Sequence, residues 1–179
     1  MNFTNVADVY AYNELSREKL MSMVAEIDAE TASKVPDGES WSIAHIVEHV
    51  AMVEEGIIKL CGKLLRDSEA GGRTSDGSVK LSESFVSKAT ESVRVKLVAP
   101  DFVQPSGKLR VDESLSKLRE NGERLEKLRQ SFESFDGTGA TFPHPAFGPM
   151  TAQDWLVLCG GHQDRHRRQI KAHLKKLAG

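Results

Sequence analysis

The sequence predicts an all-α protein, a four-helix bundle with a long crossover between the second and third of its long helices. Four long segments repeat apolar residues at the three-and-four spacing of a single helix face. No segment alternates apolar and polar residues as strongly as a half-buried strand does. A stretch rich in Gly, Ser and Pro separates the second long segment from the third. Because 179 residues are enough to bury three or four helices, we expect one domain, residues 1–179.

The first two long helices are separated by a turn. A helical pattern without Gly or Pro runs from about Thr4 to Thr31 and stops before the segment SKVPDGES. Ser40 or Ser42 then offers an N-cap for the second helix, which we expect from about Trp41 to Arg66. Its apolar stripe consists of Ile46, Val50, Val53, Ile57, Leu60 and Leu64.

The crossover is expected to contain little core structure. The segment DSEAGGRTSDGS is rich in Gly, Ser and charge, which predicts a mobile surface loop. Residues Leu81 to Val95 could form a short connecting helix. The following VRVKLVAPDFVQPSG is expected to be extended, because Pro100 and Pro105 block a continued helix.

The third and fourth long helices follow. The third is expected to begin near Asp112, its N-cap. Its inward face carries Leu115, Leu118, Leu125, Leu128 and Phe132. The loop FDGTGATFPHPAFGPM is too dense in Gly and Pro for regular structure. Thr151 then caps a final helix, with Asp154 at its third position, that runs to about Leu177.

Charge and hydropathy exclude several classes of partner. A net charge of -2 and a pI near 6.3 give no positive field to attract nucleic acid or anionic lipid. No apolar stretch is long enough for a membrane span, and the N-terminus does not resemble a secretion signal. Cys61 and Cys159 are far apart in the chain and are interpreted as reduced thiols. We therefore expect a cytoplasmic protein with neither nucleic acid nor membrane as a partner.

Two histidines on the last helix are the first candidates for a site. His162 and His166 are four residues apart, so their side chains stack one turn above the other. The pair lies on the apolar face, which also includes Trp155, Cys159, Ile170, His173 and Leu177. Imidazoles that point into a bundle need a partner. A shared metal ion would satisfy them, but so would carboxylates or backbone carbonyls, and the spacing alone leaves both alternatives open.

The second helix offers a choice of third ligand, since His45 and His49 are also four residues apart. A helical wheel places His49 at the edge of the apolar sector and His45 about 40° further toward charged residues. We therefore expect His49 to reach inward and His45 to be more exposed and to make no metal contact. Three neutral imidazoles would leave coordination positions open for water or substrate. Nickel and zinc both accept imidazole, so this ligand set does not identify the metal.

Other polar residues near this pattern are interpreted as structural. Cys159 lies one turn before His162 and is more often a small core residue than a ligand. His173 is expected to pack near the end of the bundle, and His144 to be a loop residue near the pocket mouth. The sequence has no Gly-rich phosphate loop, no GxSxG elbow and no HExxH pair, so it offers no case for nucleotide chemistry, serine hydrolysis or a zincin.

Two segments, VPDGESWSIAHIVEHV and HPAFGPMTAQDWLVLCGGHQDRHRRQI, resemble the DinB/YfiT-like superfamily. The Trp41-Ser42 start of the second helix, with His49 near its middle, looks like the family's first metal-ligand motif. His162 and His166 look like its HxxxH motif. The resemblance extends from the first helix to the last, and only loosely over residues 71–105. It implies a four-helix bundle with an unusual crossover, often a dimer, with His49, His162 and His166 as metal ligands.

Two kinds of function remain open, and the resemblance favours the first. The first is a metal-dependent enzyme, an S-transferase or a hydrolase, in which a nickel or zinc ion lowers the pKa of a bound water or thiol. Its partners would be a small-molecule electrophile and a low-molecular-weight thiol. The second is a non-catalytic bundle that the metal stabilises and that acts through a dimer surface. Residues outside the histidine triad give no candidate for a catalytic acid or base.

Overall fold

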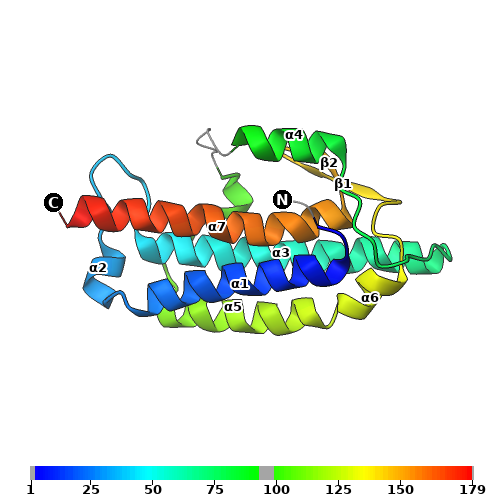
Figure 1. Cartoon of the computed structure of the whole chain (residues 1–179). Coiled ribbons are helices and arrows are strands. Elements are labelled where there is room, and N and C mark those ends of the chain that lie inside the picture. Colours follow the sequence, from blue (N-terminus) through cyan, green and yellow to red (C-terminus); the bar gives the residue numbers. More distant parts are fainter. Residues whose placement is uncertain (1–2, 93–98, 179) are drawn as a thin grey trace.

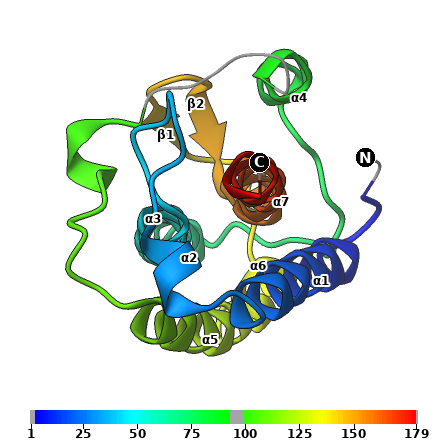
Figure 2. The ribbon, with the colours of Figure 1, turned by 90° about the vertical axis from the view of Figure 1, so that its left-hand side faces the viewer.

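Four long helices form a bundle in the computed structural model, which describes residues 3–92 and 99–178 (Figure 1). They are α1 (Val6–Ala25), α3 (Ile43–Ala70), α5 (Val111–Glu126) and α7 (Ala152–Leu177). Seen end-on in Figure 2, each helix packs on two neighbours, in the order α1, α7, α3, α5 and back to α1. The predicted all-α fold is therefore confirmed, and a small two-stranded sheet is added to it. None of the helices in the described part is long and apolar enough to cross a membrane.

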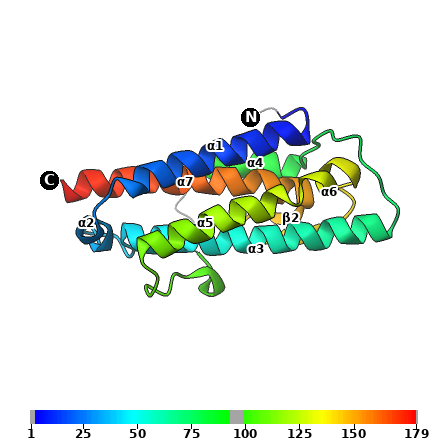
Figure 3. The same cartoon turned by 90° about the horizontal axis from the view of Figure 1, so that it is seen from below.

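The direction of the helices explains the long crossover. Helices α1 and α7 run one way along the bundle, and α3 and α5 run the other way (Figures 1 and 3). Because the neighbours α3 and α5 are parallel, the chain must return along the whole bundle between them. The return includes α4 (Glu83–Ser92) and the short 3-10 helix η1 (Asp101–Val103), which contacts α3. The predicted connecting helix is thus present as α4, and the part of it beyond residue 92 lies outside the described residues.

Local hydrogen bonds fix where the long helices start. Ser42 caps α3: its Oγ accepts from the backbone N–H of His45, and the His45 ring accepts from the backbone N–H of Ser42. Thr151 and Asp154 form the predicted capping box at the start of α7. A third capping box starts α1. These caps define the first turns of α3 and α7, the two helices that carry the candidate ligands.

The predicted first and third helices are each divided in two. The first ends at Ala25, and a separate short helix, α2 (Ala29–Ser33), begins after Asp28, whose carboxylate accepts from the backbone N–H of Thr31. The third begins at Val111 rather than after an Asp112 cap, and the carboxylate of Glu113 accepts from the backbone N–H of Arg110. It ends before Lys127. The predicted stripe residue Phe132 therefore lies on another short helix, α6 (Arg129–Ser134).

The expectation of an irregular loop before the last helix was wrong. Strands β1 (Thr141–His144) and β2 (Gly148–Thr151) form an antiparallel hairpin in which Pro143 faces Pro149. A ladder accepts two facing prolines because alternate antiparallel pairs exchange no backbone hydrogen bond. Gly148, with φ +77, adopts the left-handed conformation at the end of the tip. The hairpin leads directly into α7.

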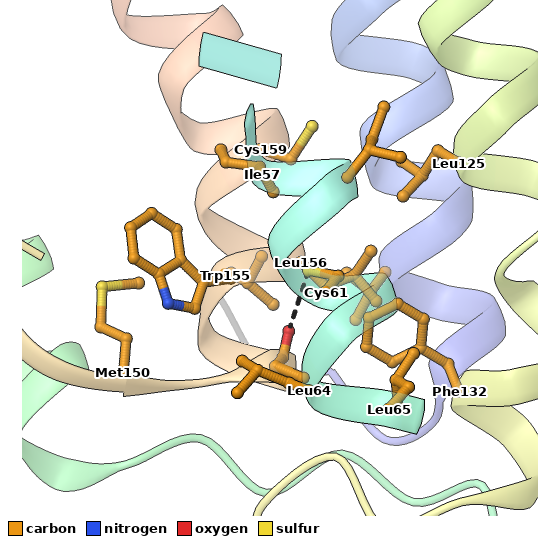
Figure 4. Packing of buried hydrophobic residues seen from close by; sticks show 14 of the residues in the cluster. Ile57, Cys61, Leu64, Leu65, Leu125, Phe132, Met150, Trp155, Leu156 and Cys159 are labelled. Carbon is orange, nitrogen blue, oxygen red and sulfur yellow. Dashed lines mark hydrogen bonds between the residues drawn. The ribbon is translucent and has the colours of Figure 1, made fainter. Parts of the chain in front are cut away.

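Two apolar clusters fill the bundle, one toward each end. One contains side chains of the second half of α3 and the first half of α7, and Figure 4 shows Leu64, Leu65, Phe132 and Leu156 packed within it. The other includes Leu20, Ile46, Val50, Leu118 and Ile170. Cys61 and Cys159 are both buried free thiols in the first cluster. The Cys61 thiol contacts the carbonyl of Ala152 at 3.7 Å (Figure 4).

A buried polar layer lies midway along the helices. Glu54 of α3 is 2% exposed, and its Oε1 accepts from the Arg17 guanidinium at 2.6 Å. The same oxygen accepts from Gln163 Nε2 of α7 at 2.9 Å and from the Cys159 thiol at 3.5 Å. Asn13 of α1 bonds α7 at two backbone groups, the carbonyl of Leu156 and the N–H of Gly160. These directional contacts tie α1, α3 and α7 at one register.

Replacing Arg17 with Met should destabilise the protein by about 3 kcal/mol, because the buried Glu54 carboxylate would lose its counter-charge. Urea unfolding followed by circular dichroism measures this change. Lys34→Met is the matched control, since Lys34 pairs with Glu30 on the surface at a similar 2.7 Å. Equal, small effects of the two substitutions would contradict a buried-charge role for Arg17.

Candidate metal centre

The structure brings together the three histidines that the sequence singled out. His49 of α3 and His162 and His166 of α7 offer nitrogen atoms that all lie within 4.8 Å of one another. The Nε2 atom of His162 is 3.2 Å from Nε2 of His49 and 3.1 Å from Nε2 of His166. His49 and His166 are 4% and 7% exposed. The cluster is therefore formed where the inward faces of α3 and α7 meet.

Hydrogen bonds at the far side of two rings determine their tautomers. The Nδ1 of His49 lies 2.8 Å from the carbonyl oxygen of Val103, and Nδ1 of His166 lies 2.8 Å from Oε1 of Gln169. Both oxygens only accept, so both Nδ1 atoms must carry the proton. In a neutral ring, Nε2 then has a free lone pair. The lone pairs of His49 and His166 thus point at the Nε2 of His162, which holds at most one proton to share.

All three rings are neutral at physiological pH. Burial lowers the pKa of His49 below its usual value. Burial, and then the nearby imidazole of His49, lowers the pKa of His166 to about 3. The pKa of His162 is well below the usual value, first through burial and then through repulsion by His166 and His49. A second proton therefore binds only weakly to any of these three rings.

The three nitrogens fit a divalent cation. With a metal–nitrogen distance of about 2.0–2.2 Å, the two measured nitrogen separations correspond to angles of roughly 90–105° at the ion. Angles of that size place the ligands on one side of an ion and leave the opposite side accessible. A cation would also satisfy the lone pairs that the shared proton cannot. The residues present therefore suit a three-histidine site with open positions.

The other candidates from the sequence lie outside the cluster. His45 is more exposed than His49, as the wheel predicts, and its ring takes part in the α3 cap. Cys159 donates to Glu54 in the polar layer. His173 is 1% exposed and its Nε2 is 3.7 Å from a carboxylate oxygen of Glu39, near the C-terminal end of α7. His144 lies at the end of β1, in regular structure rather than in a loop.

Sequence reasoning missed the residues that support the cluster. Glu48 is 2% exposed and precedes His49; its carboxylate accepts from Ser106 Oγ at 2.6 Å and from the backbone N–H groups of Ser106 and Gly107 at 2.9 and 3.0 Å. Burial raises the pKa of Glu48, but these hydrogen bonds outweigh burial and leave the pKa below its usual value. Glu48 and His49 thus hold the segment 103–107 against α3.

A glycine and an aromatic ring complete this support. Gly107 has φ +69, and a Cβ there would lie 2.7 Å from Nε2 of His45, so only glycine fits without a shift. The ring of Trp41 packs on the ring of His49 at a centroid distance of 4.9 Å. Of the residues that support His49, only Trp41 was indicated by the sequence, through its position just before the helix. The contacts of Glu48 with Ser106 and Gly107 depend on the path of the crossover.

The fold and the site together define a helical bundle with a three-histidine cluster that could hold a metal ion. The chain belongs to the DinB superfamily, whose profile matches residues 12–170. It is 23% identical over 182 residues to the uncharacterized protein YuaE of Bacillus subtilis (strain 168), spanning 99% of this chain and 98% of YuaE. Its fold is similar to the crystal structure of TT2238, a four-helix bundle protein, with a TM-score of 0.63 and 21% identity over 93% of this chain and 98% of that one.

Replacing Glu48 with Gln should destabilise the protein by about 1–3 kcal/mol, because an amide cannot accept from all three donors of Ser106 and Gly107. Urea unfolding gives the free energy, and hydrogen exchange at the two backbone N–H groups should become faster. Glu55→Gln, on the exposed side of the same helix, is the control and should change little. Unchanged exchange in Glu48→Gln would contradict the proposed anchoring.

The metal-free protein should lose stability on acidification from pH 7.5 to 5.5. Histidines whose pKa is lowered in the fold bind fewer protons than in the unfolded chain, where the pKa is about 6.5. The free energy of unfolding therefore falls as the pH falls, by up to about 1.4 kcal/mol per pH unit for each such histidine. Urea titrations with chelator at three pH values measure the slope. His166→Gln should reduce it, and a flat profile would contradict neutral buried rings.

Proposed function

We propose that this protein is a metal-dependent enzyme in which His49, His162 and His166 bind one divalent ion, nickel or zinc. Its reaction would be S-transfer or hydrolysis on a small-molecule electrophile. The observation that carries the proposal is the convergence of three neutral Nε2 atoms, two of them on buried rings and one on the half-buried ring of His162, that share at most one proton. Membership of the DinB superfamily supports it as well.

The residues of the chain would prepare such a site in three ways. Val103 and Gln169 accept the Nδ1 protons of two ligands and so direct the Nε2 lone pairs inward. Trp41 and the segment 103–107 cover His49 and keep water away from its ring. Three ligands on one side of an ion would leave coordination positions for a substrate on the other side. A bound divalent ion would act there as a Lewis acid and lower the pKa of a water or thiol.

The nucleophile would come from outside the chain. Cys61 and Cys159 are 0% and 2% exposed, and burial raises the pKa of both thiols well above the usual value. Neither can supply a thiolate at the site. A low-molecular-weight thiol or water is therefore the proposed partner of the electrophile. The proposal includes a cytoplasmic location, in keeping with the two free thiols, and a homodimer as the working assembly.

Removing one ligand should separate metal binding from folding. The wild-type protein should bind one equivalent of Ni²⁺ or Zn²⁺, and His166→Ala should weaken that affinity by about two orders of magnitude or more. The variant should stay helical in far-UV circular dichroism, because the apolar clusters provide most of the buried area. Thiol-transfer and ester-hydrolysis assays on the metal-loaded protein should lose activity with the metal.

His45→Ala is the matched control, since His45 lies one turn from His49 on the same helix but outside the cluster. It should keep full metal affinity. Unfolding of His166→Ala at room temperature would favour the non-catalytic alternative, in which the metal stabilises the bundle. Full activity of His166→Ala would mean that His166 is not a metal ligand required for the reaction.

A further inference from the structure

His144 is a fourth histidine on this side of the bundle. It ends β1 at the tip of the hairpin, and its ring lies between two aromatic rings, with centroid distances of 4.7 Å to Phe147 and 5.2 Å to Trp155. It does not belong to the three-histidine cluster. These two ring contacts hold the His144 ring in one orientation.

The hairpin turn also fixes the tautomer of His144. Its Nδ1 accepts from the backbone N–H groups of Ala146 and Phe147 at 3.0 and 3.2 Å. Burial lowers the pKa of His144 to about 4, so the ring is neutral near pH 7. A neutral ring whose Nδ1 is an acceptor carries its proton on Nε2. That Nε2–H group has no hydrogen-bond partner among the described residues, so it is a positioned donor that the fold itself does not use.

The donor lies on the same side of α7 as the cluster. Trp155, on which His144 packs, is two helical turns before His162, which is roughly 10 Å along the axis. Arg165 lies on α7 between His162 and His166 and adds a positive charge to this part of the helix. A hydrogen-bond donor and a cation thus lie along the part of α7 that carries two of the three histidines, and both favour a negatively charged group there.

We propose that His144 binds the substrate of the three-histidine site, its Nε2–H donating to a carboxylate oxygen several bonds away from the group held at the cluster. This inference rests on the proposed metal-dependent function and narrows it, because it assigns the site to small organic molecules that carry a carboxylate. His144 is then a binding residue that selects the substrate, and the three other histidines serve the reaction.

Two substitutions test the roles of the two ring nitrogens of His144 separately. His144→Asn places an acceptor near the position of Nδ1, which keeps the turn, but removes the distal donor. His144→Gln places an amide N–H near the position of Nε2 and restores the donor. Succinate is the probe, and succinamide, which has the same shape without charge, is its control. Calorimetric titration of both into the Zn²⁺-loaded wild type and variants gives the affinities.

The Zn²⁺-loaded wild type should bind succinate more tightly than succinamide, and His144→Asn should weaken succinate binding about 10-fold or more. His144→Gln should recover part of the loss, and Zn²⁺ affinity should be the same in all three proteins. Equal succinate affinity in wild type and His144→Asn would overturn the inference while leaving the metal site intact. Failure of the wild type to bind Zn²⁺ would instead overturn the proposed function.

A measurement on the metal-free wild type is independent of both the variants and the metal. Long-range ¹H–¹⁵N correlation spectra distinguish the two neutral tautomers of a histidine ring. His144 should show protonated Nε2 and unprotonated Nδ1 at pH 7, the reverse of His49 and His166. Finding Nδ1 protonated in His144 would overturn the inference even if the substituted proteins did not fold.

Discussion

The contact between α3 and α7 is the interaction on which the rest of the structure depends. Both apolar clusters include residues of α3 and α7, and His49 of α3 meets His162 and His166 of α7 at the same contact. A slip of α3 by one turn would move His49 about 5 Å and open the cluster. The Glu54–Gln163 bond joins the same two helices in the polar layer, so it opposes such a slip. A buried ionic group that sets register fits the best-attested use of such groups.

The long return of the chain is a consequence of the helix directions, and it serves the site. Because α3 and α5 run in parallel, the intervening segment has to pass along the bundle, and its last part lies on α3 beside His49. Two adjacent residues hold it there: Glu48 binds residues 106–107 and His49 binds the carbonyl of Val103. The connection thus also supplies the carbonyl oxygen of Val103, which accepts the Nδ1 proton of His49 and so selects the tautomer of this candidate ligand.

Helical periodicity was enough to predict the four bundle helices and the three histidines that converge. Burial repeats every 3.6 residues, so a wheel could separate His49 from His45 although both lie on α3. The hairpin was missed because the number of prolines in the segment argues against a strand. Composition does not reveal that Pro143 and Pro149 face each other in the ladder. The roles of Val103 and Glu48 were beyond a local pattern, since both depend on where a distant segment crosses α3. Gln169 lies one turn from His166, yet a glutamine at that spacing carries no signal by itself.

One residue ends the hairpin and starts the last helix. Thr151 is the final residue of β2 and also the N-cap of α7, so no linker separates the two elements. The hairpin tip and the histidines of α7 are therefore joined by regular structure alone, without a hinge between them. The distance from His144 to His162 is therefore fixed by strand and helix geometry. Selection by molecular length would then need no closing lid, and lengthening the chain at this junction would change which lengths fit.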